Sequence, residues 1–348
     1  MRGSNSIEGI DVSNDEAFAI VGHEEQDVSV DKAWLAVKGY SDAMTYSRIV
    51  AQGAAPSLDE SLLKGLHFMV QGYDLSKHPG QFRTGDIHVL EEETDRTVYT
   101  GPDADLVPDL VAEFMASLAQ YADAGVPAVI QGAMAHLNLV MIHPFGDGNG
   151  RMSRILQSFL LYRDEIEEAV FVSIEEYLGR NTKAYYDILA EVGRGSWRPQ
   201  GDASPWVEFN LTAHYRQART VQRRIWLLSR IAERVDELVD RHGVPERCAP
   251  VVETCFAGWR IQNATYRDIA GVSANVASRD LRLLVDTGIL QNRGLKKGAW
   301  YMPADGEVSR LRSLRGESED LFPAGLDPYR LLRRGETLPT SADVRMVG

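Results

Sequence analysis

Residues His143 to Arg154, which read His-Pro-Phe-Gly-Asp-Gly-Asn-Gly-Arg-Met-Ser-Arg, bring together several chemically capable side chains. His143 supplies an imidazole, whose ordinary pKa of ~6.5 suits a general base near neutral pH. Asp147 supplies carboxylate oxygens of the kind that hold Mg²⁺ against phosphate oxygens. Three glycines in the same stretch allow a tight loop. We therefore expect this segment to hold a nucleoside polyphosphate and to activate a hydroxyl group against it.

The flanking sequence predicts a helix, a loop and a second helix. Residues 128–142 are apolar with small residues and one buried polar position, His136, and Pro144 stops that helix. After Asn149 the apolar residues recur at helical spacing, at Met152, Ile155, Leu156, Phe159 and Leu160. A glycine-rich loop that opens a helix directs backbone N–H groups and the positive end of the helix dipole at one place. The loop is therefore a predicted anion site.

Two arginines and one aromatic residue complete this prediction. Arg151 and Arg154 lie three residues apart on one face of the second helix, where their planar guanidinium groups can hold two phosphate groups. We expect Phe145 to point inward and to anchor the loop.

The segment resembles the signature of the Fic family, His-x-Phe-x-Asp/Glu-Gly/Ala-Asn-Gly followed by two arginines, at every defining position. Fic proteins are α-helical enzymes, and most transfer AMP from ATP to a hydroxyl side chain of a target protein. The resemblance implies that His143 is the catalytic base and that Asp147 binds Mg²⁺. It also implies a phosphate site, with Arg154 at the γ-phosphate, formed by Gly148, Asn149, Gly150, Arg151 and Arg154. Relatives that phosphorylate with a reversed nucleotide carry Lys where this chain has Gly150, which favours AMP transfer.

The first ten residues contain Ser4-Asn5-Ser6-Ile7-Glu8-Gly9, which resembles the inhibitory motif of the family, Ser/Thr-x-x-x-Glu-Gly/Asn. Its N-terminal position is similar to that of the motif in the class of Fic proteins whose inhibitory helix precedes the catalytic core. The resemblance implies that Glu8, one helical turn from Ser4, pairs with Arg154 and blocks the γ-phosphate site. Some relatives use this glutamate to remove AMP from the target, and the sequence leaves that reverse reaction open.

Two further segments are expected to face the substrates. Short β-prone runs at residues 87–90 and 97–99 predict a hairpin. It is similar to the family's flap, which implies target contacts at Thr97, Val98 and Tyr99. Residues 173–192 predict one helix that carries Tyr185 and Tyr186, and Tyr186 is either an adenine contact or an ordinary core residue. Some relatives place Asn where this chain has Gly193.

Composition excludes several other classes of protein. The chain has 348 residues, a formal net charge of −13 and 44% hydrophobic residues, which argues against a generic nucleic-acid coat. No apolar run is long enough for a membrane span, and the first residues do not resemble a signal peptide. The two cysteines, Cys248 and Cys255, have no metal-ligand spacing and suggest a reducing compartment. We therefore expect a cytoplasmic protein with no membrane partner.

The predicted fold is mainly α, a Fic-type helical core with a small β-hairpin flap, followed by a winged helix-turn-helix. Residues 265–270 and 275–287 predict two short helices around a turn, and residues 288–300 predict a strand and a wing. Such a module would present to DNA Asn275, Ser278, Arg279, Arg282, Lys296 and Lys297. Residues 245–302 carry eight basic and five acidic residues, so this segment is only mildly basic and protein docking is as plausible as DNA binding.

These elements divide the chain into five segments. They are an N-terminal helical segment with the inhibitory motif (1–56), a catalytic core (57–211), a connecting helix (212–244), a winged helix-turn-helix (245–303) and a loosely ordered tail (304–348). The leading hypothesis is an autoinhibited, Mg²⁺-dependent protein adenylyltransferase that uses ATP, acts on a Ser, Thr or Tyr hydroxyl of a target protein and forms a homodimer. The alternatives are a DNA-binding regulator with a nucleotide-sensing domain, and transfer of another nucleotide or phosphate-linked group.

Overall fold

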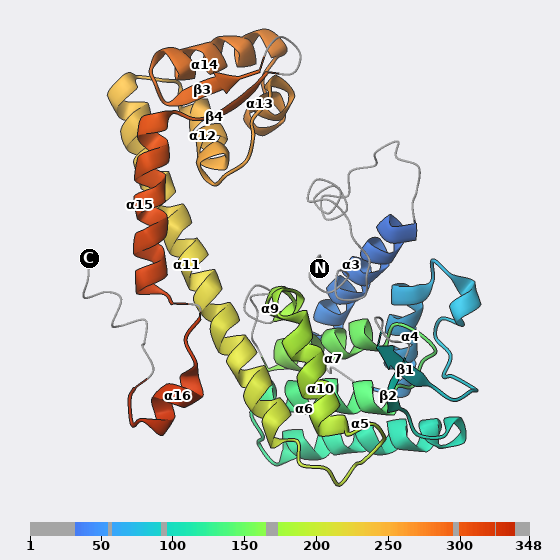
Figure 1. Ribbon diagram of the computed structural model, residues 1–348. Coiled ribbons are helices and arrows are strands. Elements are labelled where there is room, and N and C mark those ends of the chain that lie inside the picture. The colour runs from blue at the N-terminus through green and yellow to red at the C-terminus, as the bar shows by residue number, and fades with distance from the viewer. Residues whose placement is uncertain are drawn as a thin grey trace. The chain divides into compact units, whose positions relative to one another are not determined.

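The computed structural model describes residues 32–54, 58–91, 96–164, 173–294, 299–323 and 325–337 (Figure 1). Within these residues the chain forms two compact units. One extends to Gln217 and includes Asp327–Arg333, and the other comprises Ala218–Leu326 and residues 334–337. Ser4, Glu8, Lys296 and Lys297 lie outside the described residues, so their predicted roles stay predictions.

The first unit is a helical bundle around one central helix. Its elements are α3 (Lys32–Ala51), α4 (Glu60–Gln71), α5 (Val107–Asp123), α6 (Ala128–Ile142), α7 (Asn149–Arg163), α9 (Glu175–Arg180), α10 (Thr182–Gly193), the part of α11 (Ser204–His242) up to Gln217 and α16 (Pro328–Arg333), with short 3₁₀ turns at Leu75–Lys77 and Ala104–Leu106. A two-stranded antiparallel hairpin of β1 (His88–Glu91) and β2 (Arg96–Thr100) joins α4 to α5. The expectation of a mainly α fold with a small β-hairpin is confirmed.

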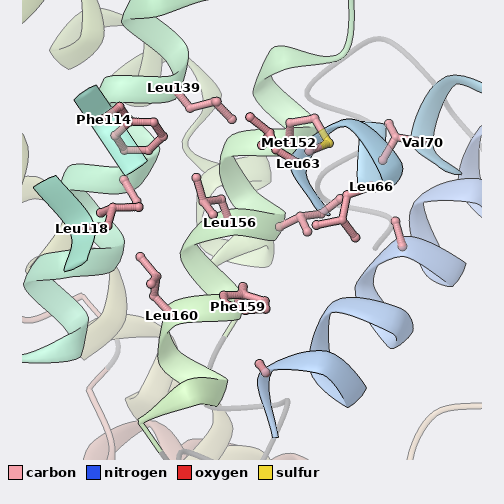
Figure 2. Close-up of a cluster of buried hydrophobic side chains, with 14 of the residues drawn as sticks. Leu63, Leu66, Val70, Phe114, Leu118, Leu139, Met152, Leu156, Phe159 and Leu160 are labelled. Atoms are coloured by element: carbon pink, nitrogen blue, oxygen red, sulfur yellow. The ribbon is translucent and has the colours of Figure 1, made fainter. Parts of the chain in front are cut away.

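Helix α7 is buried on every face, except at Gly150 and Arg163. Figure 2 shows its apolar side chains between those of α4 on one side and those of α5 and α6 on the other; they include Met152, Leu156, Phe159 and Leu160. A helix that is surrounded by protein is held rigidly, because its side chains fill a close-packed interior. The predicted apolar positions of this helix are confirmed as core, and the loop before it therefore rests on a rigid support.

Helices α6 and α7 approach each other closely at Gly132. A Cβ atom at this position would lie 3.2 Å from the backbone oxygen of Gln157 on α7. Next to this contact, Gln157 lies at the centre of a buried polar cluster, since it hydrogen-bonds His136, Asn210 and His214 at 2.7, 3.1 and 2.9 Å. Burial lowers the pKa of His136 to about 3 and that of His214 to about 4, so both rings are neutral at pH 7.

Two helices differ from their predicted extents. The single helix expected over 173–192 is interrupted at Asn181, where φ is −127° and the side-chain amide donates to the carbonyl of Tyr177. Such a local side-chain bond competes with the helix. The connecting helix expected from 212 instead begins at Ser204, so Trp206 to Phe209 belong to its first turns. Pro205 suits a helix start and Gly243 with φ of 59° suits its end, and neither residue type occurs between them.

The second unit is built on the part of α11 that follows Gln217. It contains α12 (Ala249–Phe256), α13 (Asn263–Ala270), α14 (Ala274–Asp286), an antiparallel hairpin of β3 (Leu290–Arg293) and β4 (Trp300–Pro303), and α15 (Asp305–Leu321), with a 3₁₀ turn at Glu246–Cys248. Ile261 forms an isolated antiparallel β-bridge with Tyr301 of β4. The two predicted helices, the turn between them and the predicted strand are therefore present, while part of the predicted wing, residues 295–298, lies outside the described residues.

The prediction of a loosely ordered tail after residue 303 is wrong for α15. This helix is held to α11 by Arg234, whose guanidinium donates to both carboxylate oxygens of Glu307 at 3.0 and 2.6 Å. Leu311 and Leu314 pack on the core of the unit, three residues apart. The apolar face is narrow in a segment that is otherwise rich in charge, which is why the sequence pattern missed the helix. No helix among the described residues is both long and apolar enough to cross a membrane.

Candidate active site

His143 ends α6 in a left-handed backbone conformation, with φ of 53° and ψ of 57°. Its backbone N–H donates to the carbonyl of Leu139 at 2.9 Å, and its ring Nδ1 lies 2.9 Å from the carbonyl oxygen of Val140. Because that carbonyl can only accept, Nδ1 carries the proton of the neutral ring and Nε2 carries the lone pair. A non-glycine residue in this conformation costs of order 1–3 kcal/mol, and such strain clusters at functional sites. The geometry suits a base that acts through Nε2.

Phe145 and Asn149 close the loop that follows. The ring of Phe145 is fully buried, as predicted, and stacks on the ring of His67 with 3.7 Å between centroids. The side-chain oxygen of Asn149 accepts the N–H of Phe145 at 3.0 Å, and its side-chain nitrogen donates to the carbonyl of Phe145 at 2.8 Å. The side chain of Asn149 therefore shapes the loop, and only its backbone N–H can serve the predicted anion site.

Gly148 turns the chain into α7, with φ of 79°. The N–H groups of the first helical residues, Asn149, Gly150 and Arg151, precede the first intrahelical bond, which Met152 donates to the carbonyl of Gly148. Beside this turn lies Gln71 of α4, whose buried amide has no hydrogen-bond partner among the described residues. The loop thus presents unsatisfied donors at the positive end of a rigid helix, as an anion site requires.

Replacing Gly148 with alanine is expected to cost about 1–3 kcal/mol of stability, because alanine resists a φ of 79°. The new Cβ would also lie 3.2 Å from the amide nitrogen of Gln71 and displace the loop. Gly146→Ala is the matched control, since a Cβ there meets nothing within 4 Å and its φ is ordinary. Urea unfolding of both variants checks the prediction, and equal losses at the two glycines would contradict it.

Arg151 is a buried cation with unsatisfied donors. Only 2% of its surface is exposed, and its Nε and Nη1 have no hydrogen-bond partner among the described residues. Its Nη2 lies 4.0 Å from a carboxylate oxygen of Asp147. A buried guanidinium that lacks partners is costly, so its retention next to a helix N-terminus fits a bound anion such as phosphate. Arg154 is equally buried, one helical turn further along α7.

Asp147 is the only motif carboxylate, and it is partly exposed. Its Oδ1 accepts the N–H of Gly148 at 2.6 Å, and its Oδ2 lies 3.4 Å from Nζ of Lys77. Among the described residues no group of three potential metal ligands occurs. One carboxylate beside a phosphate site nevertheless fits Mg²⁺, which in nucleotide sites binds one or two carboxylates, phosphate oxygens and water. Lys77 lies in no motif, so its contact with Asp147 was not predicted from the sequence.

The segment that leads into the hairpin is tied to the loop by Arg83. Its backbone N–H donates to the carbonyl of Pro144 at 2.9 Å, and its Nε donates to the carbonyl of His143 at 2.8 Å. Its other guanidinium nitrogens donate to the carbonyls of Gly85 and Pro102. These bonds fix the base of the hairpin directly against the loop that begins at His143.

The three predicted flap residues differ in their surroundings. Thr97 is exposed and Val98 is half-buried, so both remain available to a partner. Tyr99 is buried, and its hydroxyl donates to the carbonyl of Met141 on α6 at 2.6 Å. Tyr99 therefore anchors the hairpin to α6, and its buried side chain is not available to a target. At the end of β2, Thr100 donates its N–H to the carbonyl of Gly195 at 3.0 Å.

The tyrosine pair of α10 divides between core and surface. Tyr185 is buried, and its hydroxyl lies 2.9 Å from Nε2 of His136. Tyr186 is 46% exposed, so the core alternative is excluded for this residue. Its ring lies 5.3 Å from that of Tyr185, which holds it in place. Tyr186 remains a candidate for the adenine contact.

In the second unit, the predicted contact residues on α14 are exposed, namely Asn275, Ser278, Arg279 and Arg282. Asp280, on the opposite side of this helix, is buried and accepts two hydrogen bonds from Arg247 at 2.8 and 2.9 Å. The hydroxyl of Tyr266 on α13 donates to the same carboxylate at 3.0 Å. This buried network fixes the orientation of α14 and thus the direction of its exposed polar face.

Comparison with known proteins places a family domain on this site. Residues 57–161 match the model of the Fic/DOC family. The protein adenylyltransferase Fic of Aedes aegypti is 34% identical over 116 residues, which cover 32% of this chain and only 20% of the mosquito protein. A crystal structure of a Fic family protein from Desulfovibrio desulfuricans G20 has a TM-score of 0.53 at 19% identity, over 87% of this chain and 84% of that one.

A crystal structure of a Fic domain containing signaling protein from Bacteroides thetaiotaomicron is similar in the same way. Its TM-score is 0.52 at 20% identity, over 62% of this chain and 82% of that one. The matched family region contains α4, the hairpin, α5, α6 and most of α7, and thus the whole loop from His143 to Arg154. Residues 57–161 of this chain therefore carry a Fic/DOC family domain.

Proposed function

We propose that this protein is a Mg²⁺-dependent adenylyltransferase, which transfers AMP from ATP to a Ser, Thr or Tyr hydroxyl of a target protein. The observation that carries the proposal is the pairing of a base with an anion site on one rigid loop. Nε2 of His143 holds a lone pair, and buried Arg151, at the N-terminus of α7, has two nitrogens that lack a hydrogen-bond partner within the part of the chain that the structure describes. The curated relatives that match this region are named protein adenylyltransferase Fic, which supports the same reaction here.

In the proposed reaction the target hydroxyl oxygen attacks the α-phosphorus of ATP. The bond from that phosphorus to the bridging oxygen breaks, and pyrophosphate leaves as AMP becomes esterified to the target. His143 accepts the hydroxyl proton at Nε2. Gly148, Asn149, Gly150, Arg151 and Arg154 hold the phosphate groups through backbone N–H groups and guanidinium donors. When bound at Asp147, Mg²⁺ would neutralise charge on the phosphate oxygens.

Catalysis of this kind depends mainly on positioning and on charge stabilisation. The buried helix α7 and the bonds that Asn149 and Arg83 make to the loop supply the rigid support that positioning requires. Tyr186 is proposed to contact the adenine ring, and Thr97 and Val98 to contact the target segment beside β2. The same chemistry leaves transfer of a different nucleotide as the nearest alternative, because the loop contacts phosphates.

The donor is tested by supplying ATP labelled at the α-phosphate or at the γ-phosphate, with Mg²⁺, to the purified protein and a cell lysate as target source. AMP transfer puts only the α-label on protein. Label from the γ-phosphate alone would show phosphorylation instead, and competition by unlabelled GTP, CTP and UTP would show whether another nucleotide is preferred.

We further propose that the enzyme is autoinhibited by its N-terminal segment, in which Glu8 pairs with Arg154 and Ser4 supports it. With Arg154 engaged, ATP can bind without correct alignment of its α-phosphorus. The same glutamate could position a water molecule for removal of AMP from the target. A homodimer is the proposed assembly, and activity that depends on protein concentration across dimer dissociation is its test.

A second proposed function is DNA binding by the second unit. The order of elements there is α12, the β-bridge at Ile261, α13, α14 and the β3–β4 hairpin, and it is similar to the order in a winged helix-turn-helix. In that arrangement α14 enters the major groove. Its exposed Asn275, Ser278, Arg279 and Arg282 are the side chains that would contact bases or phosphates.

Replacing both Arg279 and Arg282 with alanine is expected to weaken DNA binding about 10-fold or more. An arginine contact to a base contributes ~1–3 kcal/mol, and an arginine contact to a phosphate neutralises one phosphate charge. If the arginines contact phosphates, the slope of affinity against salt concentration also falls. The double variant Arg310→Ala with Arg312→Ala on α15 is the matched control. Both arginines are exposed, and replacing them removes the same charge. Equal binding by both double variants would favour a protein-docking role for α14.

A further inference from the structure

Helix α4 presents two buried polar side chains to the catalytic loop, and neither belongs to the family motif. His67 and Gln71 lie one helical turn apart on the face that packs against α7. The ring of His67 is parallel to that of Phe145, with 6° between their planes. Its Nε2 lies 3.0 Å from the carbonyl oxygen of Asp147, and its Nδ1 lies 2.9 Å from the backbone nitrogen of Gly80.

These two contacts define the proton position on His67. The N–H of Gly80 can only donate, so Nδ1 accepts and carries no proton. The carbonyl of Asp147 can only accept, so Nε2 carries the proton and donates it. Burial lowers the pKa of His67 to about 4, in agreement with a neutral ring at pH 7. Both ring nitrogens are thus used, each in the role that the neighbouring backbone demands.

The ring therefore links the catalytic loop to the segment that precedes the hairpin. Gly80 lies three residues before Arg83, which itself holds the carbonyl of His143. On the other side, Gln71 packs against the turn at Gly148. The peptide unit of Asp147 is held by His67 through its carbonyl, while its carboxylate accepts the N–H of Gly148 at the start of α7. Moving this peptide unit would move the carboxylate.

We propose that His67 is a positioning residue, which fixes the peptide unit of Asp147 so that its carboxylate faces the phosphate site and can hold a divalent cation there. The proposal rests on the proposed function for the identity of the ligand, Mg²⁺ with ATP. Groups that hydrogen-bond to a metal ligand commonly fix its orientation, and we assign this role to His67. Loss of such a group typically lowers metal affinity or activity 10–100-fold.

The test uses two substitutions that separate stacking from hydrogen bonding. His67→Phe keeps a planar ring over Phe145 and removes both hydrogen bonds, whereas His67→Gln keeps a donor near the position of Nε2. We expect His67→Phe to raise the Mg²⁺ concentration for half-maximal binding of a fluorescent ATP analogue about 10-fold. We also expect kcat to fall about 10²-fold, because a displaced ligand misaligns the reacting atoms, with a much smaller change in KM at saturating Mg²⁺. His67→Gln should recover most of both losses.

His214→Phe and His214→Gln are the controls, because His214 is a half-buried histidine whose pKa is also lowered, to about 4, but it hydrogen-bonds Gln157 in the cluster beneath α6. They should lower Tm without changing the Mg²⁺ dependence. The proposal is overturned if His67→Phe lowers Tm as the control does and leaves the Mg²⁺ dependence unchanged, or if His67→Gln is as impaired as His67→Phe. A wild-type protein that binds Mg²⁺ and ATP without transferring AMP would contradict the proposed function, and the binding measurement would still decide the role of His67.

Discussion

Replacing His143 with alanine is expected to lower AMP transfer by a factor of ~10²–10⁴, the usual contribution of a general base. Val140 fixes the proton on Nδ1, so Nε2 is the nitrogen that accepts the hydroxyl proton. The phosphate contacts come from α7 and its N-terminus, so binding of ATP should change little. Single-turnover rates with α-labelled ATP, together with ATP affinity from fluorescence titration, check both parts of the prediction.

His78→Ala is a suitable control for the backbone effect of that change. His78 is left-handed as well, with φ of 51° and ψ of 57°, and its side chain is exposed. Strain that alanine adds at such a position should appear in both variants, whereas loss of the base should appear only at His143. A His143→Ala protein that transfers AMP at the rate of His78→Ala would exclude His143 as the base.

Replacing Glu8 with glycine is expected to raise the initial rate of AMP transfer about 10²-fold, the penalty that a misplacement of ~1 Å imposes. The reason is electrostatic, since removal of the carboxylate leaves the buried guanidinium of Arg154 to the γ-phosphate. The rate with α-labelled ATP is the measurement, and ATP affinity should change far less than the rate.

Glu24→Gly serves as the control for this second prediction, because it removes the same charge from the N-terminal stretch without touching the inhibitory motif. An increase in both variants would indicate a general effect of charge. No increase in Glu8→Gly would mean that Glu8 does not inhibit this enzyme.

The local structure of the loop was predictable because each feature depends on neighbouring residues. Pro144 ends α6, Gly148 opens α7, and the apolar spacing of α7 identifies its buried faces. The roles of His67 and Tyr99 were not predictable, because each depends on contacts between segments far apart in the chain. In the sequence, His67 is only one polar residue of an amphipathic helix. Its contacts with Phe145 and Asp147 are known only from the structure.

Several predicted helix boundaries differ from the structure, because local composition alone does not determine where these helices begin and end. Helix α15 is rich in charge, and it forms because Arg234 of α11 pairs with Glu307 and a few leucines reach the core. Asn181 interrupts the helix expected over 173–192 through a bond that its own side chain makes. The connecting helix was expected to begin at residue 212, and in the structure α11 begins at Ser204. That helix contributes to both compact units.

The most direct test of the central claim compares three purified proteins, namely wild type, Glu8→Gly, and Glu8→Gly with His143→Ala, each with Mg²⁺ and ATP labelled at the α-phosphate. Label on protein should be weak for wild type, strong for Glu8→Gly and at background for the double variant. Strong label that persists without His143, or no label in any form despite bound ATP, would contradict AMP transfer by this site.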